Sequence, residues 1–224
     1  MGLPRVAVKD VLRTLEELYP DAHCALHHQN AFELLIATIL SAQCTDKRVN
    51  EVTPKLFAVC GTPQRLAEAC VEDVESLICE CGLFKTKAKN IVAASRMLVD
   101  EFACAVPDDM ESLLRLPGVG RKTANVVLSN IFGVPAIAVD THVQRVSNRL
   151  GLAESDDVAE TERQLMERIP RPLWSSAHHW LIYHGRQVCT ARTPRCEICA
   201  LAPFCKQFKM EVKKRHKQMS KPTV

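Results

Sequence analysis

The sequence predicts an all-α protein. Apolar residues recur every three or four positions along most of the chain, which is the spacing of amphipathic helices, and no long stretch alternates apolar with polar residues as a strand would. Residues that start and stop helices flank the apolar stretches: Pro20 follows the first of them and Gly151 a later one. The 224 residues, 47% of them hydrophobic, suffice for one large domain or two small ones.

The most apolar of the expected helices lies in the first half of the chain. Its sequence, AFELLIATILSAQ, is apolar all round and predicts a central, buried position. The amphipathic helix before it has an apolar face made of Val8, Val11, Leu12, Leu15 and Leu18. The next helix is expected to be capped at Thr45 and Asp46 and to run to about residue 59. Shorter helices follow in PQRLAEA and DVESLICE, and a long one in KTKAKNIVAASRMLVDEF.

Further helices are expected over 108–115, from Arg121 to Gly133, from Asp140 to Gly151, and near 157–169 and 172–186. Asp108 is the predicted N-cap of the first of these, because Glu111 stands three residues later as in a capping box. The segment AIAVD is expected to be short and extended. From Lys213 onward the chain reads KKRHKQMSKPTV, a basic tail that we expect to fray.

Charge and hydropathy narrow the possible classes of protein. The net charge is only +3, so binding to nucleic acid would require a local basic face. The N-terminal MGLPRVAVKD has no long apolar run, so we expect no signal peptide. The longest apolar stretch, LLIATIL, is far too short to span a bilayer. We therefore expect no contact with membranes, and a place in the cytoplasm or the nucleus.

Eleven cysteines are many for a reducing compartment. Seven are scattered, mostly within helical apolar patterns, and are expected to be small buried hydrophobes: Cys24, Cys44, Cys60, Cys70, Cys79, Cys81 and Cys104. The other four lie within 17 residues near the C-terminus: Cys189, Cys196, Cys199 and Cys205. Four thiolates so close together can converge on one metal centre.

Two kinds of metal centre remain open for these four cysteines, tetrahedral zinc and a [4Fe–4S] cluster. Zinc sites usually combine two short cysteine pairs, whereas here only the middle pair is short and the outer gaps are six and five residues. This spacing weakens the case for zinc without excluding it. An electron-transfer ferredoxin would account for the cysteines but would leave most of the upstream chain without a role.

The segment LPGVGRKTANVV does not fit a nucleotide-binding P-loop, because Arg121 separates Gly120 from Lys122 and position 115 is Arg. It fits a helix–hairpin–helix, in which Gly118 and Gly120 allow backbone conformations closed to other residues. The hairpin amides and the N-terminus of the second helix would bind a DNA phosphate without reading base sequence.

Lys122 has two possible roles. The helix macrodipole, the charges of Arg115 and Arg121, and partial burial would all lower its pKa, and a neutral amine is a nucleophile. A solvated lysine that binds phosphate fits the local sequence equally well. Asp140, eighteen residues later at the start of a helix, favours the nucleophile. An anchored carboxylate suits a reaction that passes through a sugar cation and then a Schiff base.

Together these motifs resemble the endonuclease III family of DNA glycosylases. The hairpin, the VDTHV segment and the C-x6-C-x2-C-x5-C loop match in order and spacing, as do LLIATILSAQCTDKRVN and HHWLIYHGR. The resemblance covers roughly residues 25–210 and implies two helical lobes with a DNA-binding cleft between them. The implied boundaries are a six-helix lobe over 24–134 with the helix–hairpin–helix at about 108–132, an iron–sulfur lobe of 1–23 plus 135–212, and the tail 213–224.

The resemblance also implies an activity: excision of oxidised pyrimidines from duplex DNA and cleavage of abasic sites by β-elimination. It makes Lys122 the Schiff-base nucleophile and Asp140 the catalytic carboxylate, and it assigns a [4Fe–4S] cluster to the four C-terminal cysteines. Gln43 would fill the gap left by a flipped base, and Leu83 would act as an apolar wedge. Further DNA contacts are expected from Gly118, Gly120, Arg121, Arg192 and Arg195.

Two alternatives accompany this interpretation. An adenine-mismatch branch shares the cluster and the aspartate but lacks the lysine nucleophile, which is present here as Lys122. A non-catalytic helix–hairpin–helix protein with an iron–sulfur cluster would bind duplex DNA and leave it intact. One position departs from the family pattern, because Thr193 stands where members often carry a lysine. We expect the protein to act as a monomer.

Overall fold

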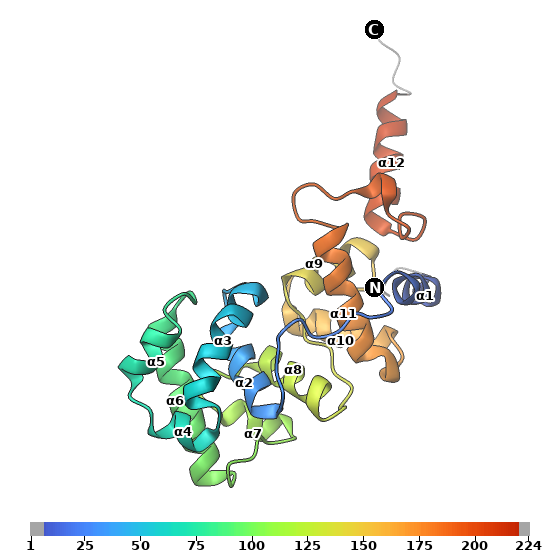
Figure 1. Cartoon of the computed structure of the whole chain (residues 1–224). Coiled ribbons are helices and arrows are strands. Elements are labelled where there is room, and N and C mark those ends of the chain that lie inside the picture. Colours follow the sequence, from blue (N-terminus) through green and yellow to red (C-terminus); the bar gives the residue numbers. More distant parts are fainter. Residues whose placement is uncertain (1–6, 220–224) are drawn as a thin grey trace. The chain divides into compact units, whose positions relative to one another are not determined.

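A computed structural model describes residues 7–219, and every regular element in that range is a helix (Figure 1). The all-α prediction is therefore confirmed. The chain divides into two compact units. One comprises Cys24–Ala136, and the other combines the chain up to His23 with the chain from Ile137 onward. No helix in the described part of the chain is long and apolar enough to cross a membrane.

The unit over Cys24–Ala136 is built around one buried helix. Its helices are α2 (Ala31–Leu40), α3 (Asp46–Cys60), α4 (Pro63–Glu68), α5 (Val71–Leu77), α6 (Phe84–Glu101), α7 (Met110–Arg115) and α8 (Arg121–Ile131). Helix α2 packs against α3, α6 and α8, and eight of its ten residues are buried. The central, buried helix predicted from AFELLIATILSAQ is thus confirmed, and it forms the base on which the hairpin between α7 and α8 rests.

The other unit is formed by both ends of the chain. It contains α1 (Val8–Leu18), α9 (Thr141–Leu150), α10 (Val158–Arg168), α11 (Trp174–Gln187), α12 (Lys206–Met219) and the 3-10 helices η1 (Arg171–Leu173) and η2 (Cys196–Ile198). Helix α11 packs against α9 and α1. Leu15, Val143 and Leu181 lie fully buried in the shared core. This core holds α9, which begins after Asp140, against the cysteine loop that follows α11.

Two helix ends differ from the sequence prediction. Asp109, not Asp108, is the N-cap of α7, and its Oδ1 accepts a hydrogen bond from the amide of Ser112 at 2.8 Å. The helix starts one residue later than expected, so Glu111 lies too early in it to complete a capping box. The tail expected to fray from Lys213 is helical as far as Met219, in keeping with the helix propensity of its Lys, Arg and Gln residues. Residues 220–224 of that tail lie outside the described residues.

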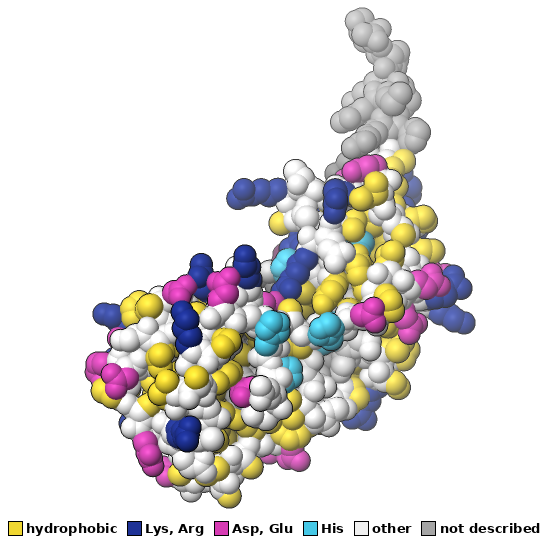
Figure 2. All heavy atoms as spheres, viewed as in Figure 1, with side chains coloured by type: hydrophobic (Ala, Val, Ile, Leu, Met, Phe, Trp, Pro, Cys, Tyr) yellow, Lys and Arg dark blue, Asp and Glu magenta, His cyan; other side chains and the backbone are white. Residues whose placement is uncertain are grey.

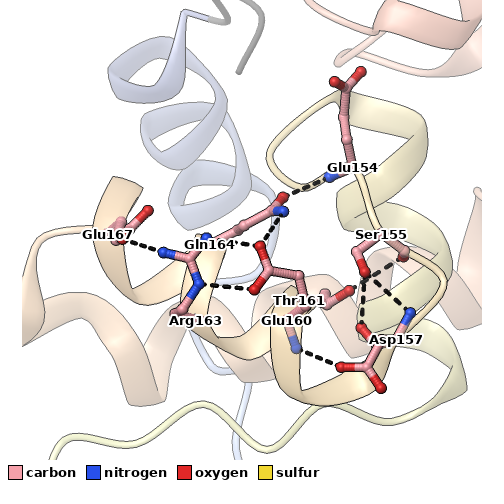
Figure 3. A network of polar contacts seen from close by, with 8 residues as sticks. All are labelled: Glu154, Ser155, Asp157, Glu160, Thr161, Arg163, Gln164 and Glu167. Atoms are coloured by element: carbon pink, nitrogen blue, oxygen red, sulfur yellow. Dashed lines mark hydrogen bonds and ion pairs between the residues drawn. The ribbon is translucent and has the colours of Figure 1, made fainter. Parts of the chain in front are cut away.

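A polar network fixes the start of α10 (Figure 3). Asp157 caps the helix by accepting from the amide of Glu160 at 2.8 Å. Arg163 Nε donates to Glu160 Oε2 at 2.8 Å, and Gln164 Nε2 donates to Glu160 Oε1 at 2.7 Å; these bonds lower the pKa of Glu160 to about 2. Gln164 Oε1 in turn accepts from the amide of Glu154 at 2.7 Å, which joins α10 to the segment that connects it with α9.

The scattered cysteines do not share one environment. Cys60 and Cys81 are buried, as expected, and Cys24, Cys44 and Cys104 are partly buried. Cys70 and Cys79 are exposed, so the prediction of buried hydrophobes is wrong for them. Cys70 is the N-cap of the short helix α5 and Cys79 follows its C-cap, Ile78, so neither lies within a helix that could turn it toward a core.

Candidate functional site

The hairpin between α7 and α8 contains two glycines with different roles. Gly118 has a φ of +80°, and a Cβ there would lie 3.0 Å from Asn90 Cβ and 3.2 Å from Ile39 Cγ2. Glycine adopts this backbone without strain and leaves room for the close approach to α6 and α2. Gly120 has an ordinary φ of −99°, and a Cβ there would meet no atom within 4 Å. Gly118 therefore seats the hairpin on its own unit, whereas Gly120 keeps open space in front of α8.

Lys122 lies in the first turn of α8, just behind that open space. Gly120 is the N-cap and supplies no side chain, and no acidic residue occurs in the first turn, so the helix presents uncompensated amides and positive charge. The side chain of Lys122 is exposed, so the partial burial expected from the sequence is wrong. Arg115 pairs with Glu101, which offsets its charge.

Asp140 is the N-cap of α9. Its Oδ1 accepts hydrogen bonds from the amides of His142 and Val143, both at 2.8 Å. Two backbone bonds at a helix start hold the carboxylate in one orientation, and because both use Oδ1 the cap does not occupy Oδ2. Burial lowers the pKa of His142, although the charge of Asp140 acts in the opposite direction. Asp140 is thus a rigidly held carboxylate beside a histidine whose protonated form is disfavoured by burial.

Gln43 and Leu83 occupy exposed turns at the ends of α2 and α6 in the same unit. Both are non-glycine residues in the left-handed region, with φ of 52° and 59°. Leu83 is 58% exposed, which excludes a place in the core. A Cβ on Gly82 would lie 3.2 Å from the carbonyl oxygen of Gln43, so the two turns touch. Strained residues of this kind cluster at functional sites.

The four C-terminal cysteines line one cavity: Cys189, Cys196, Cys199 and Cys205. Burial raises the pKa of the Cys199 and Cys205 thiols, and the neighbouring thiols raise it further. Thiols that are costly to ionise alone are suited to a metal centre, because the metal charge removes their protons on binding. Four cysteines that line one cavity provide the kind of donor set that an iron–sulfur cluster uses.

A buried pair of side chains supports this cavity from the core. His184 is 1% exposed and Tyr19 is 8% exposed. The Tyr19 hydroxyl lies 3.0 Å from His184 Nδ1, and His184 Nε2 lies 3.6 Å from Cys199 Sγ. Burial lowers the pKa of His184 to about 4 and, as the largest cause, raises that of Tyr19 to about 12. A neutral histidine that accepts from Tyr19 carries its proton on Nε2, so it can donate toward Cys199.

Arginines of α9 hold the cysteine loop. Arg149 Nη1 donates to the carbonyl of Thr190 at 2.7 Å, Nη2 donates to that of Ala191 at 2.8 Å, and Nη1 also lies 3.4 Å from Cys189 Sγ. Arg145 Nε donates to the carbonyl of Cys189 at 3.0 Å. Sequence reasoning missed these arginines, as it missed His184 and Tyr19. Their four-residue spacing on one face of a helix that follows Asp140 was the available signal.

The two arginines of the cysteine loop that were expected to contact DNA differ in their surroundings. The guanidinium of Arg195 donates to the carbonyl of Gln187, so it stabilises the loop itself. Arg192 is exposed. On the face of the molecule shown in Figure 2, Lys and Arg side chains are interspersed with acidic ones and do not gather into one broad patch. Binding of a polyanion there would therefore depend on individual basic groups.

Comparison with known proteins assigns the family. The model of the HhH-GPD superfamily of base excision DNA repair proteins matches residues 36–171, and that of the iron–sulfur binding domain of endonuclease III matches 189–205. Endonuclease III of Synechocystis sp. is 52% identical over 92% of this chain and 94% of its own length. The chain belongs to the endonuclease III family. Endonuclease III of Escherichia coli is 45% identical, over 91% of this chain and 96% of its own length.

Solved structures agree with membership of the endonuclease III family. A trapped covalent endonuclease III–DNA intermediate has a TM-score of 0.88 and 48% identity, covering 93% of this chain and all of its own. A non-covalent endonuclease III–DNA complex has a TM-score of 0.87 and 49% identity, covering 92% and 97%. As a family member, the chain is a base excision repair DNA glycosylase for oxidised pyrimidines with AP lyase activity, and it carries a [4Fe–4S] cluster.

Proposed function

We propose that Lys122 is the nucleophile with which this enzyme attacks C1′ of a damaged nucleotide in duplex DNA. One observation carries the proposal. The amine is exposed in the first turn of α8, directly behind Gly120, where nothing crowds the backbone. A DNA strand held at the hairpin by its phosphate would present its sugar to a group at this position. The endonuclease III–DNA complexes to which the chain is similar support duplex DNA as the partner.

The chemistry follows from an amine nucleophile. Lys122 Nζ donates its electron pair to C1′, and the glycosidic bond breaks with its electrons going to the base, which leaves protonated. Opening of the sugar and loss of a proton from nitrogen give an imine. The imine acidifies C2′, and loss of the C2′ proton expels the 3′ phosphate. Asp140, held by two amides of α9, would stabilise the positive charge on the sugar and assist proton transfer.

The remaining residues position the DNA. The amides at Gly118 and Gly120 and the Arg121 side chain would hold the backbone, while the exposed Gln43 and Leu83 would enter the base stack. A base must leave the stack before a protein group can reach its sugar from the enzyme side, and an inserted amide can hydrogen-bond the orphaned partner base. The exposed side chain and left-handed backbone of each residue support these roles.

The four C-terminal cysteines are proposed to hold the cluster through their thiolates. When bound, the cluster would cross-link the loop over 189–205 and keep it folded, as structural metal centres do. Arg149 and His184 would support the loop from α9 and α11, and Arg192 would remain available for a phosphate. Because its relatives include endonuclease III of the bacterium Escherichia coli, we also propose that the enzyme acts in the cytoplasm, on nucleoid DNA.

Two substitutions of Lys122 test the nucleophile. Lys122→Gln removes the amine, and Lys122→Arg keeps a positive charge that can bind phosphate but cannot form an imine. Both variants should bind an abasic duplex, because the hairpin amides are intact, and both should lose borohydride trapping and strand cleavage together. If Lys122→Arg still cleaved the duplex, Lys122 would be a phosphate-binding residue and the nucleophile would lie elsewhere.

A further inference from the structure

A buried polar cluster lies beneath the two turns that carry Gln43 and Leu83. Its members are Lys87, which is 4% exposed, Cys81, which is 1% exposed, and the partly buried Cys44. Lysine is almost never buried so completely unless its ammonium group is paired. Burial lowers the pKa of Lys87, and burial followed by the Cys44 thiol raises that of Cys81 to about 11. Burying the Lys87 ammonium costs free energy, which an interaction of this side chain within the fold must offset.

Lys87 connects the two turns. Its Nζ donates to the carbonyl of Leu40 at 2.7 Å, while its amide makes an ordinary helical hydrogen bond to the carbonyl of Leu83, the N-cap of α6, at 3.1 Å. Leu40 is the last residue of α2, where helix carbonyls lack partners within the helix and a positive charge is favourable. One residue in the first turn of α6 therefore ties the end of α2, three residues before Gln43, to the turn at Leu83.

Two further observations link the same turns. The Cys44 thiol contributes to the raised pKa of Cys81, so the two thiols lie near one another. The close approach of Gly82 to the Gln43 carbonyl adds a backbone contact between the turns. Non-glycine residues keep a left-handed backbone only where the surroundings fix it, and Gln43 and Leu83 both do so here. The hydrogen bond from Lys87 to the Leu40 carbonyl and the approach of Gly82 to Gln43 supply that constraint.

We propose that Lys87 is a positioning residue for DNA insertion: by tying the end of α2 to the first turn of α6, it holds Gln43 and Leu83 ready to enter the duplex together. This inference rests on the insertion roles given to those two residues under the proposed function. It assigns Lys87 no contact with DNA, because a buried ammonium cannot reach a phosphate. A phosphate-binding lysine would increase the salt dependence of affinity, whereas Lys87 should not.

The test compares Lys87→Met with Lys89→Met, an exposed lysine on the same helix. Single-turnover cleavage is measured on a duplex with one abasic site and on the same strand alone. Lys87→Met should cleave the duplex roughly 10-fold or more slowly, since a buried hydrogen bond to a charged group is lost. It should change single-strand cleavage less than about 2-fold, the scale of a surface substitution. Lys89→Met should preserve both rates, and the salt slope of Lys87→Met should match the unmodified enzyme.

A double-mutant cycle separates positioning from general loss of structure. If Lys87 acts through Gln43, the variant combining Lys87→Met with Gln43→Ala should be little slower on duplex than Gln43→Ala alone, because the two losses overlap. Additive losses, or equal losses on duplex and single strand, would overturn the inference. If Gln43→Ala slows the duplex reaction and Lys87→Met does not, the inference alone is refuted. If Gln43→Ala and Leu83→Ala both leave it unchanged, the insertion roles fail, and the inference with them.

A second variant keeps the proposal testable if Lys87→Met does not fold. Gly82→Ala places a Cβ 3.2 Å from the Gln43 carbonyl and so shifts the same junction from the surface. It should give the same duplex-selective loss, with the helical signal and the visible absorption of the cluster unchanged. A folded Gly82→Ala enzyme with normal duplex cleavage would show that the junction does not position these residues.

Discussion

Gly118→Ala and Gly120→Ala should separate folding of the hairpin from binding of DNA. At Gly118 the new methyl group meets Asn90 and Ile39 at 3.0–3.2 Å, and the backbone has a φ of +80°. A left-handed backbone costs an L-residue about 1–2 kcal/mol, and overpacking typically adds about 1–3 kcal/mol, so Gly118→Ala should lose about 2–5 kcal/mol of stability. At Gly120 the backbone is ordinary and the space is empty, so Gly120→Ala should be nearly neutral for stability.

Thermal unfolding and DNA binding are the two measurements. Each kcal/mol should lower the unfolding midpoint by about 2–4 °C in a chain of this size, so Gly118→Ala should be visibly destabilised. Fluorescence anisotropy with an abasic duplex should show weaker DNA binding by Gly120→Ala although its stability is kept. The reason is that the new methyl group occupies the space into which a phosphate would enter. Equal stability of the two variants, or full DNA affinity of Gly120→Ala, would refute this division of roles.

Three further outcomes are expected. Asp140→Asn should keep the α9 cap, because Asn is as good an N-cap as Asp, and should retain DNA binding, but single-turnover excision should fall ~100-fold or more. Arg192→Ala should reduce the slope of log affinity against log salt by about 1 if the exposed guanidinium meets a phosphate, as titration of binding between low and moderate salt would show. His184→Phe should release iron to a chelator faster than the unmodified enzyme, because His184 Nε2 lies beside Cys199. Hydrogen exchange in Cys24–Ala136 should stay the same, because His184 belongs to the other unit; an unchanged rate of iron release would argue against support of the cysteine loop by His184.

The helices were predictable because their signals are local. The apolar stretch of α2 has no polar face, which leaves burial as its only stable environment, and Thr45 caps α3 by accepting from the amide of Arg48 at 3.2 Å. Adjacent aspartates at 108 and 109 are a different case. Either could cap α7 by residue type; the structure uses Asp109, in a helix that buries Leu113, and this burial is a tertiary feature that local sequence does not reveal.

The candidate site was predictable where the spacing of glycine, lysine and cysteine indicated a motif. It was not predictable where tertiary contacts determine the burial or backbone conformation of a residue. Lys87 stands in the basic run KTKAKN, which looks like a solvated helix start, and its burial depends on the carbonyl of Leu40 far away in the sequence. Nothing in the residue types of Gln43 and Leu83 favours a left-handed backbone. The exposure of Lys122 was likewise not readable from its neighbours.

The unit that carries the cysteine loop takes its helices from both ends of the chain, so it can complete its folding only late in synthesis. Helix α1 leaves the ribosome early, but α11, against which it packs, is translated last but one. At about 5–20 residues per second, α1 must wait ~10–30 s for its partner, while Cys24–Ala136 can already fold. The cluster ligands follow later still. A nascent chain stalled after Ala136 would therefore expose an amphipathic α1 to chaperones. Binding of the cluster would be the last step in folding of the unit.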